Sequence, residues 1–188
     1  MHRRRFVVTL TSFLAMPAPV AAQKAGKIWR IGYLSLVSER LEHSRRWLAA
    51  FREGLRTLGY VEGQNAIIEQ RYAAGQVERL PALTAELVGL KVDVIVAAPA
   101  GSALAAKKVT STVPIVFMAE PDPVGVGLVA SLARPGGNAT GLADAHADLI
   151  PKRLELLNQV MPPSSRVGVL WNPANASTAP QLKIQVFF

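Results

Sequence analysis

Two apolar stretches decide the fold of this chain: VDVIVAA at residues 92–98 and IVFMA at residues 115–119. Each is nearly continuous in apolar residues, which is typical of a strand that helices cover on both faces. Each also runs directly into a loop, PAGS at residues 99–102 and EPDP at residues 120–123. Because open α/β sheets bind ligands at the carboxyl ends of their strands, these two loops are candidate contact sites.

Strand-like and helix-like segments alternate upstream of these stretches. Residues 28–36 and 66–72 predict two strands, each followed by a helical pattern of apolar residues. The first helix has apolar residues on one stripe, with Gly59 placed as its C-cap glycine: Trp47, Leu48, Phe51, Leu55 and Leu58. The second has leucines at helical spacing, with Pro81 near its start: Leu80, Leu83, Leu87 and Leu90. The alternation predicts an α/β fold with a doubly wound parallel sheet.

Shorter elements follow the two apolar stretches. Residues 102–110 predict an Ala-rich helix capped by Ser102, and residues 124–132 predict a further helix. The turn cluster PGGN at residues 135–138 precedes a brief edge strand at residues 139–141. We expect these elements to complete one unit.

A new unit begins near residue 144. Apolar residues at helical spacing, with Pro151 at their start, predict a helix: Ile150, Leu154, Leu157 and Met161. Residues 166–170 predict a strand, but one helix and one strand cannot bury their own apolar faces. We therefore expect an N-terminal α/β lobe at residues 23–143 and the start of a C-terminal α/β lobe at residues 144–188, incomplete because the chain is truncated.

The N-terminus has the order of features found in a secretory signal peptide. Three arginines, Arg3 to Arg5, precede an apolar run at residues 6–16, and small residues end at Ala22. We expect residues 1–22 to be removed on export to the periplasm by the Sec route or by the twin-arginine route. The alternative is a disordered or core-packed N-terminus.

Composition excludes several classes of site. The lack of cysteine excludes disulfides, thiolate metal sites and cysteine nucleophiles. The net charge is +8, but the basic residues are scattered without aromatic interleaving, so we expect no nucleic-acid partner. Neither GxGxxG nor GxxxxGK with a following Ser or Thr is found after a strand. His43 and His146 are isolated and no serine has a nucleophile-elbow context, so we expect no metal, no cofactor and no catalysis.

The two loops carry polar groups that suit a small ligand. Gly101 and Ser102 stand at a helix N-terminus, where free N–H groups favour an anion such as a carboxylate; the alternative is an ordinary capped helix. Glu120 and Asp122 flank Pro121 and are able to accept hydrogen bonds from an amine, a sugar hydroxyl or a cation. Hydrolytic acid/base chemistry and a solvated turn are the alternatives for this pair.

Five segments resemble one bacterial family: RIGYL at residues 30–34, FREGLRTLGY at 51–60, TVPIVF at 112–117, DPVGVGLVASLARPGGNATG at 122–141 and LWNP at 170–173. The chain resembles ABC transporter substrate-binding proteins of the tryptophan/tyrosine type, which have a type I periplasmic-binding-protein fold. The resemblance implies an exported receptor whose two α/β lobes close over a small solute and present it to an ABC permease in the inner membrane. It also implies a chain near twice this length.

Carried onto this chain, the resemblance predicts that the binding cleft is lined by strand exits: Ser35, Pro99, Ala100, Gly101, Ser102, Glu120, Pro121, Asp122 and Asn172. The expected solute is small and amino-acid-like or otherwise carboxylated. The alternatives are a non-functional receptor fragment, the effector-sensing domain of a regulator, and a small hydrolase or flavodoxin-like enzyme.

Overall fold

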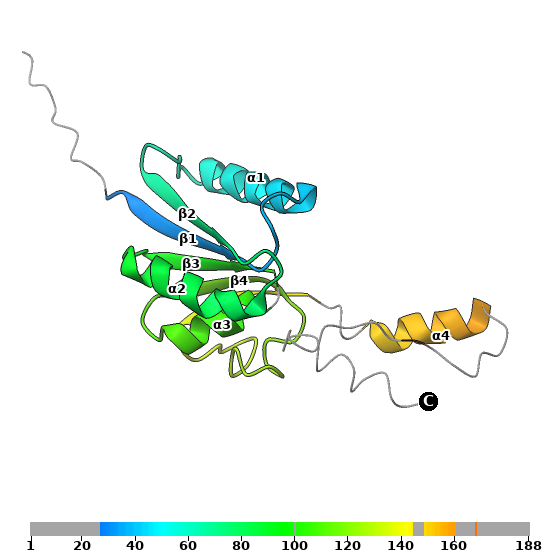
Figure 1. Cartoon of the computed structure of the whole chain (residues 1–188). Coiled ribbons are helices and arrows are strands. Elements are labelled where there is room, and N and C mark those ends of the chain that lie inside the picture. Colours follow the sequence, from blue (N-terminus) through cyan, green and yellow to red (C-terminus); the bar gives the residue numbers. More distant parts are fainter. Residues whose placement is uncertain (1–26, 100, 145–148, 161–167, 169–188) are drawn as a thin grey trace, which may run out of the picture.

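A five-stranded parallel sheet forms the centre of the molecule (Figure 1). The computed structural model describes residues 27–99, 101–144, 149–160 and 168. The strands are β1 (Trp29–Ser35), β2 (Ala66–Tyr72), β3 (Val94–Ala98), β4 (Ile115–Glu120) and β5 (Ala139–Ala143). In space they lie in the order β2-β1-β3-β4-β5. The two apolar stretches at residues 92–98 and 115–119 thus contain neighbouring strands, β3 and β4.

Helices cover both faces of this sheet. The helix α1 (Glu42–Thr57) packs on one face, whereas α2 (Leu80–Gly89) and α3 (Ser102–Val109) pack on the other (Figure 1). A 3-10 helix, η1 (Val77–Arg79), leads into α2. The chain moves outward from β1 to β2 and then back past β1 to β3 and β4, and right-handed crossovers in opposite directions put their helices on opposite faces. The predicted doubly wound parallel sheet is confirmed.

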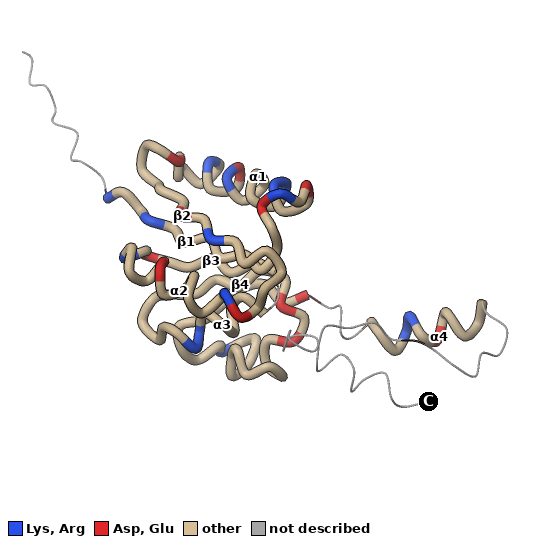
Figure 2. The backbone as a smooth tube through the Cα atoms, viewed as in Figure 1, with Lys and Arg blue, Asp and Glu red and all other residues tan. Residues whose placement is uncertain are grey.

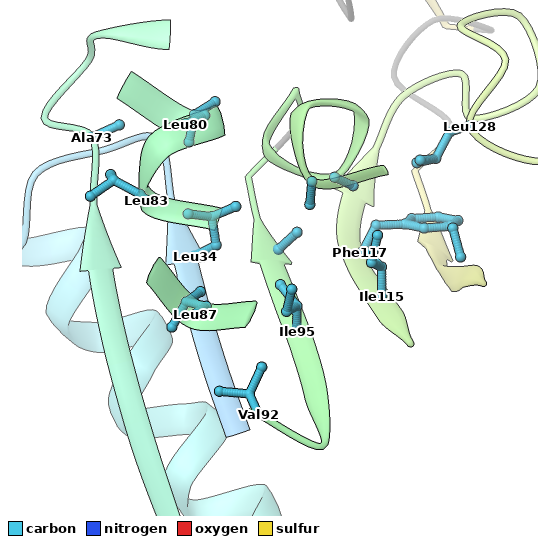
Figure 3. Packing of buried hydrophobic residues seen from close by; sticks show 14 of the residues in the cluster. Leu34, Ala73, Leu80, Leu83, Leu87, Val92, Ile95, Ile115, Phe117 and Leu128 are labelled. Atoms are coloured by element: carbon cyan, nitrogen blue, oxygen red, sulfur yellow. The ribbon is translucent and has the colours of Figure 1, made fainter. Parts of the chain in front are cut away.

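The larger apolar core lies between the sheet and the layer formed by α2 and α3 (Figure 3). It joins leucines of α2 to residues of three strands: Leu80, Leu83 and Leu87 with Leu34, Ile95, Ile115 and Phe117. A Cβ added at Gly32 would lie 3.1 Å from Cδ1 of Leu87, so α2 approaches β1 closely at this glycine. Each fully buried leucine contributes about 2 kcal/mol. The predicted leucine stripe and the early Pro81 of α2 are confirmed.

The smaller core lies beneath α1, where the predicted stripe proves too wide. Leu48 is buried and Phe51 is half-buried, but Trp47 is 42% exposed and Leu58 is 74% exposed. The Trp47 ring packs edge-on against His43, one turn earlier on the helix surface, and Leu58 is already the C-cap residue. Gly59 follows the C-cap residue with a left-handed φ of +85°, so the predicted helix-ending glycine is confirmed.

Residues 124–132 do not form the predicted helix. They form a series of turns, in which Gly127 has a left-handed φ of +71°. Glycine favours such conformations and weakens a helix, so the apolar pattern alone was misleading. The amino group of Lys107 on α3 donates to the carbonyls of Gly127 and Leu128 at 2.9 and 2.8 Å, which holds this loop against the helix.

The last described elements follow the sequence pattern. The edge strand predicted at residues 139–141 is β5, which runs two residues further and pairs parallel to β4. The helix α4 (Ile150–Val160) has Pro151 at its second position and lies apart from the sheet in Figure 1. The strand predicted at residues 166–170 falls outside the described residues. Within the described part of the chain, no helix has the length and apolarity needed to cross a membrane.

Candidate functional site

The exits of β1 and β3 lie side by side at the point where the strand order reverses. Ser35 ends β1 and pairs in register with Ala98, which ends β3. The N–H of Leu36 then donates to the Ala98 carbonyl at 3.3 Å. Doubly wound sheets bind their ligands in the crevice at such a switch point.

The exit of β4 adjoins the same edge. The backbone N–H of Gly101, after β3, donates to Oε2 of Glu120, at the end of β4, at 3.1 Å. The fold therefore places the predicted residues of three strand exits on one edge of the sheet: Ser35, Pro99, Gly101, Ser102, Glu120, Pro121 and Asp122. Two other predicted site residues, Ala100 and Asn172, lie outside the described residues.

The predicted site residues on this edge differ in how far they are exposed to solvent. Three of the polar ones are buried: Ser35 at 1%, Ser102 at 0% and Glu120 at 1% exposed. Pro99, Gly101, Pro121 and Asp122 are partly exposed. Among the predicted residues that the structure describes, the partly exposed ones thus supply two prolines, a glycine backbone and one carboxylate, and the other polar groups are buried.

Ser102 does not cap α3 as predicted. Gly101 is the N-cap residue, with φ +89°, and no side chain accepts a hydrogen bond at this cap. A left-handed φ suits glycine, and it turns the chain so that Ser102 is already the first helical residue. The Ser102 hydroxyl instead donates to the Ala98 carbonyl at 3.4 Å, which is a weak contact.

Both acids of the EPDP loop bind backbone amides of the protein itself. Glu120 accepts from Gly101, and Oδ1 of Asp122 accepts from the N–H of Gly125 at 2.8 Å. Carboxylates that accept backbone N–H bonds in this way fix the conformation of a loop. The two acids thus have a structural part on this edge whatever else they contact.

A polar depression at the carboxyl end of β2 was missed by the sequence reading. It has a volume of about 440 Å³ and is lined by the loop after β1, the end of β2 and the turn before α2: Ser38, Glu39, Arg40, Gln70, Arg71, Tyr72, Ala74, Arg79 and Leu83. Burial and the nearby Glu39 carboxylate raise the pKa of Tyr72. The arginines that line the depression suit an anionic group. The strand-exit rule, applied to β2 as well as to β3 and β4, would have found it.

Charged residues elsewhere are interspersed. Figure 2 shows both basic and acidic residues along α1, and two of its arginines pair with acids: Arg52 with Glu62 at 2.6 Å and Arg56 with Glu53 at 2.7 Å. Exposed pairs of this kind contribute little to stability. No group of three or more histidines, aspartates or glutamates able to hold a metal ion occurs among the described residues.

Comparison with known proteins matches the chain to one family. The family model described as "ABC transporter substrate binding protein" matches residues 37–186. A "Tyrosine-binding protein" of Clostridioides difficile is 34% identical over 152 residues, which are 80% of this chain and 42% of that relative.

Two solved structures are similar as well. A conserved domain protein of Vibrio cholerae has a TM-score of 0.71 and 31% identity, covering 84% of this chain and 52% of that one. An ABC domain from Streptococcus pneumoniae, in complex with L-Trp, has a TM-score of 0.57 and 28% identity, covering 65% and 42%. This chain spans about half the length of these proteins. By sequence and by fold, the chain belongs to the ABC transporter substrate binding protein family.

Proposed function

We propose that this chain is the solute-binding component of a bacterial ABC importer, and that its solute is a small molecule, an amino acid or a close analogue. The main observation behind the proposal is that the exits of β1 and β3 lie side by side at the point where the strand order reverses, and that the exit of β4 lies next to them. The named activity of one relative, tyrosine binding, and the L-Trp bound to one structural neighbour support an aromatic amino acid.

The accessible residues of this edge form the proposed contact wall. Pro99, Gly101, Pro121 and Asp122 face the solute, and the buried Ser35, Ser102 and Glu120 lie behind them. Ala100 and Asn172 remain proposed contacts. The opposite wall of an interlobe cleft belongs to a second lobe that begins near residue 144. Solute binding by two such walls is tight only when contacts on both sides form together.

The cellular setting follows from the same proposal. Residues 1–22 direct export by the Sec or the twin-arginine route, the mature receptor works in the periplasm, and its protein partner is an ABC permease in the inner membrane. The receptor binds its solute and releases it unchanged, without catalysis or cofactor.

The experiment is a thermal and calorimetric binding assay on the purified chain with the twenty amino acids, their D-enantiomers and glucose. We expect L-Trp or L-Tyr to raise the unfolding temperature, because a ligand at about 100 times its Kd adds about 2.7 kcal/mol to the stability of the folded state. The variant Asp122→Asn should weaken binding, while Glu62→Gln, at the opposite end of the sheet, should not. Glucose binding without amino-acid binding, or no binding by any of these solutes, would contradict the proposal.

A further inference from the structure

The strand β4 contains a register irregularity immediately before its exit. Met118 pairs with Leu142 of β5, but the next pair is Glu120 with Ala143, so Ala119 is an extra residue with no partner in the ladder. Ala119 has a φ of +54°, a left-handed conformation that is unusual for a residue other than glycine. This arrangement is a β-bulge, a feature that commonly redirects a side chain beside a binding site.

The extra residue decides on which side of the sheet Glu120 lies. In an unbroken strand side chains alternate, so Glu120 would follow Met118 toward the α1 side. With Ala119 inserted, Glu120 falls instead on the side of Phe117, where α2 and α3 pack. The contacts agree with this, because Glu120 is 1% exposed and its Oε2 lies 3.1 Å from the Gly101 nitrogen at the start of α3.

Gly101 connects this contact to the first turn of α3. Its N–H donates to Glu120, and its carbonyl accepts from the N–H of Ala105 at 3.2 Å, which is the first hydrogen bond of the helix. The left-handed Gly101 supplies no side-chain cap of its own. The carboxyl group of Glu120 therefore holds the residue at which α3 begins.

We propose that Glu120 is a positioning residue, which the bulge at Ala119 turns inward so that it fixes Gly101 and joins the β3 and β4 exits into one rigid contact wall. The inference rests on the proposed function and refines it. Gly101 gives its N–H to the protein, so this amide is not offered to a solute carboxylate, and Glu120 acts on solute binding through the loop.

Two variants separate this role from direct solute contact. Glu120→Gln retains an oxygen that accepts from Gly101 at the same place, whereas Glu120→Leu has a similar size and no acceptor. The first readout needs no solute: the hydrogen-exchange rate of the Gly101 amide, measured by NMR on the full chain. In Glu120→Gln we expect the Gly101 amide to exchange within about threefold of the wild-type rate. In Glu120→Leu we expect it to exchange at least about tenfold faster than in the wild type. Core amides such as that of Ile95 report whether the fold is intact.

The second readout is the affinity for L-Trp and L-Tyr. We expect Glu120→Gln to bind within about threefold of wild type and Glu120→Leu to lose about tenfold or more. A Gln variant that loses affinity as severely as the Leu variant, while Gly101 stays protected, would overturn the proposal, because the carboxylate would then contact the solute. Unchanged Gly101 exchange in Glu120→Leu would overturn the proposal as well.

If Glu120→Leu does not fold, Glu120→Asp replaces it with the same expectations, because the aspartate side chain is one methylene too short to reach Gly101. A wild-type chain that binds none of the amino acids tested defeats the proposed function, while the exchange readout still decides the role of Glu120.

Discussion

The carboxylate of Asp122 accepts a hydrogen bond from the backbone N–H of Gly125 at 2.8 Å, and a Cβ at position 125 would overlap that carboxylate. The contact closes a tight turn directly after β4, and the Val126 N–H returns to the Asp122 carbonyl at 3.1 Å within the same turn. The acid and the glycine thus depend on each other, and the turn fixes where the Asp122 carboxylate can point.

Replacing Gly125 with alanine tests this dependence. The added methyl group should push the Asp122 side chain away and break its hydrogen bond, at a cost of about 1 kcal/mol in the free energy of unfolding. The amino-acid affinity should fall together with stability if Asp122 belongs to the contact wall. Urea unfolding and calorimetry measure the two effects; wild-type values of both would show that the turn tolerates a displaced carboxylate.

Gly141 allows β5 to approach β4. A Cβ at this position would overlap backbone atoms of Phe117, so Gly141→Ala must push the two strands apart, and we expect a loss of about 3 kcal/mol. The matched control is Gly54→Ala on α1, where nothing lies within 4 Å of the added methyl and alanine is the better helix former, so stability should rise by about 0.5–1 kcal/mol. Equal effects of the two substitutions in urea unfolding would refute the close approach.

Asn138 links the end of α3 to the start of β4. Its Nδ2 donates to the carbonyl oxygens of Thr110 at 3.0 Å and Val113 at 2.8 Å. The near-isosteric Asn138→Asp removes this donor and faces both carbonyls with another oxygen, so we expect a loss of about 2 kcal/mol or more at neutral pH. Asn138→Ala should destabilise as well. An aspartate variant as stable as wild type in urea would mean that these two hydrogen bonds contribute nothing.

The Tyr33 hydroxyl predicts a pH dependence. Tyr33 is fully buried, its hydroxyl has no hydrogen-bond partner in the part of the chain that the structure describes, and burial, aided by Tyr72, raises its pKa to about 12. Between about pH 10 and 12 the unfolded chain loses this proton and the folded chain keeps it, so stability falls as the pH rises, by up to about 1.4 kcal/mol per pH unit.

The variant Tyr33→Phe should remove that alkaline loss. At pH 7 it should also be about 1 kcal/mol more stable than wild type, because an unsatisfied buried hydroxyl is deleted. Tyr72→Phe is the control, since its hydroxyl donates to Oε1 of Gln70 at 3.0 Å and its removal should not stabilise the protein. Parallel stability curves of wild type and Tyr33→Phe from pH 8 to 12 would contradict the account.

Much of the sheet was predictable because strand and helix periods differ plainly in this sequence. The bounds of β2 match the predicted residues 66–72, and the leucine spacing of α2 identified its buried face. The predictions that failed depend on backbone conformation. The helix at residues 124–132 was assigned from apolar residues, but Asp122 and Gly125 close a turn there.

The candidate site was predictable in place and only partly in detail. Strand exits follow from the order of elements, so the edge that holds Ser35, Gly101 and Asp122 could be named from the sequence. The direction of Glu120 could not, because it depends on the pairing between β4 and β5 and on the left-handed Ala119. No local pattern in a single sequence encodes such a register shift.

We propose that the solute binds at the carboxyl edge of the sheet, at the exits of β1, β3 and β4. A titration of the ¹⁵N-labelled chain with L-Trp, followed by amide NMR shifts, tests it most directly, since even weak binding to one wall of a cleft moves these signals. We expect saturable shifts at Ser35, Gly101 and Asp122, and none at Asn65 and Asp93, which precede β2 and β3 at the opposite edge. Shifts confined to Asn65 and Asp93, or no shifts at millimolar L-Trp, would contradict it.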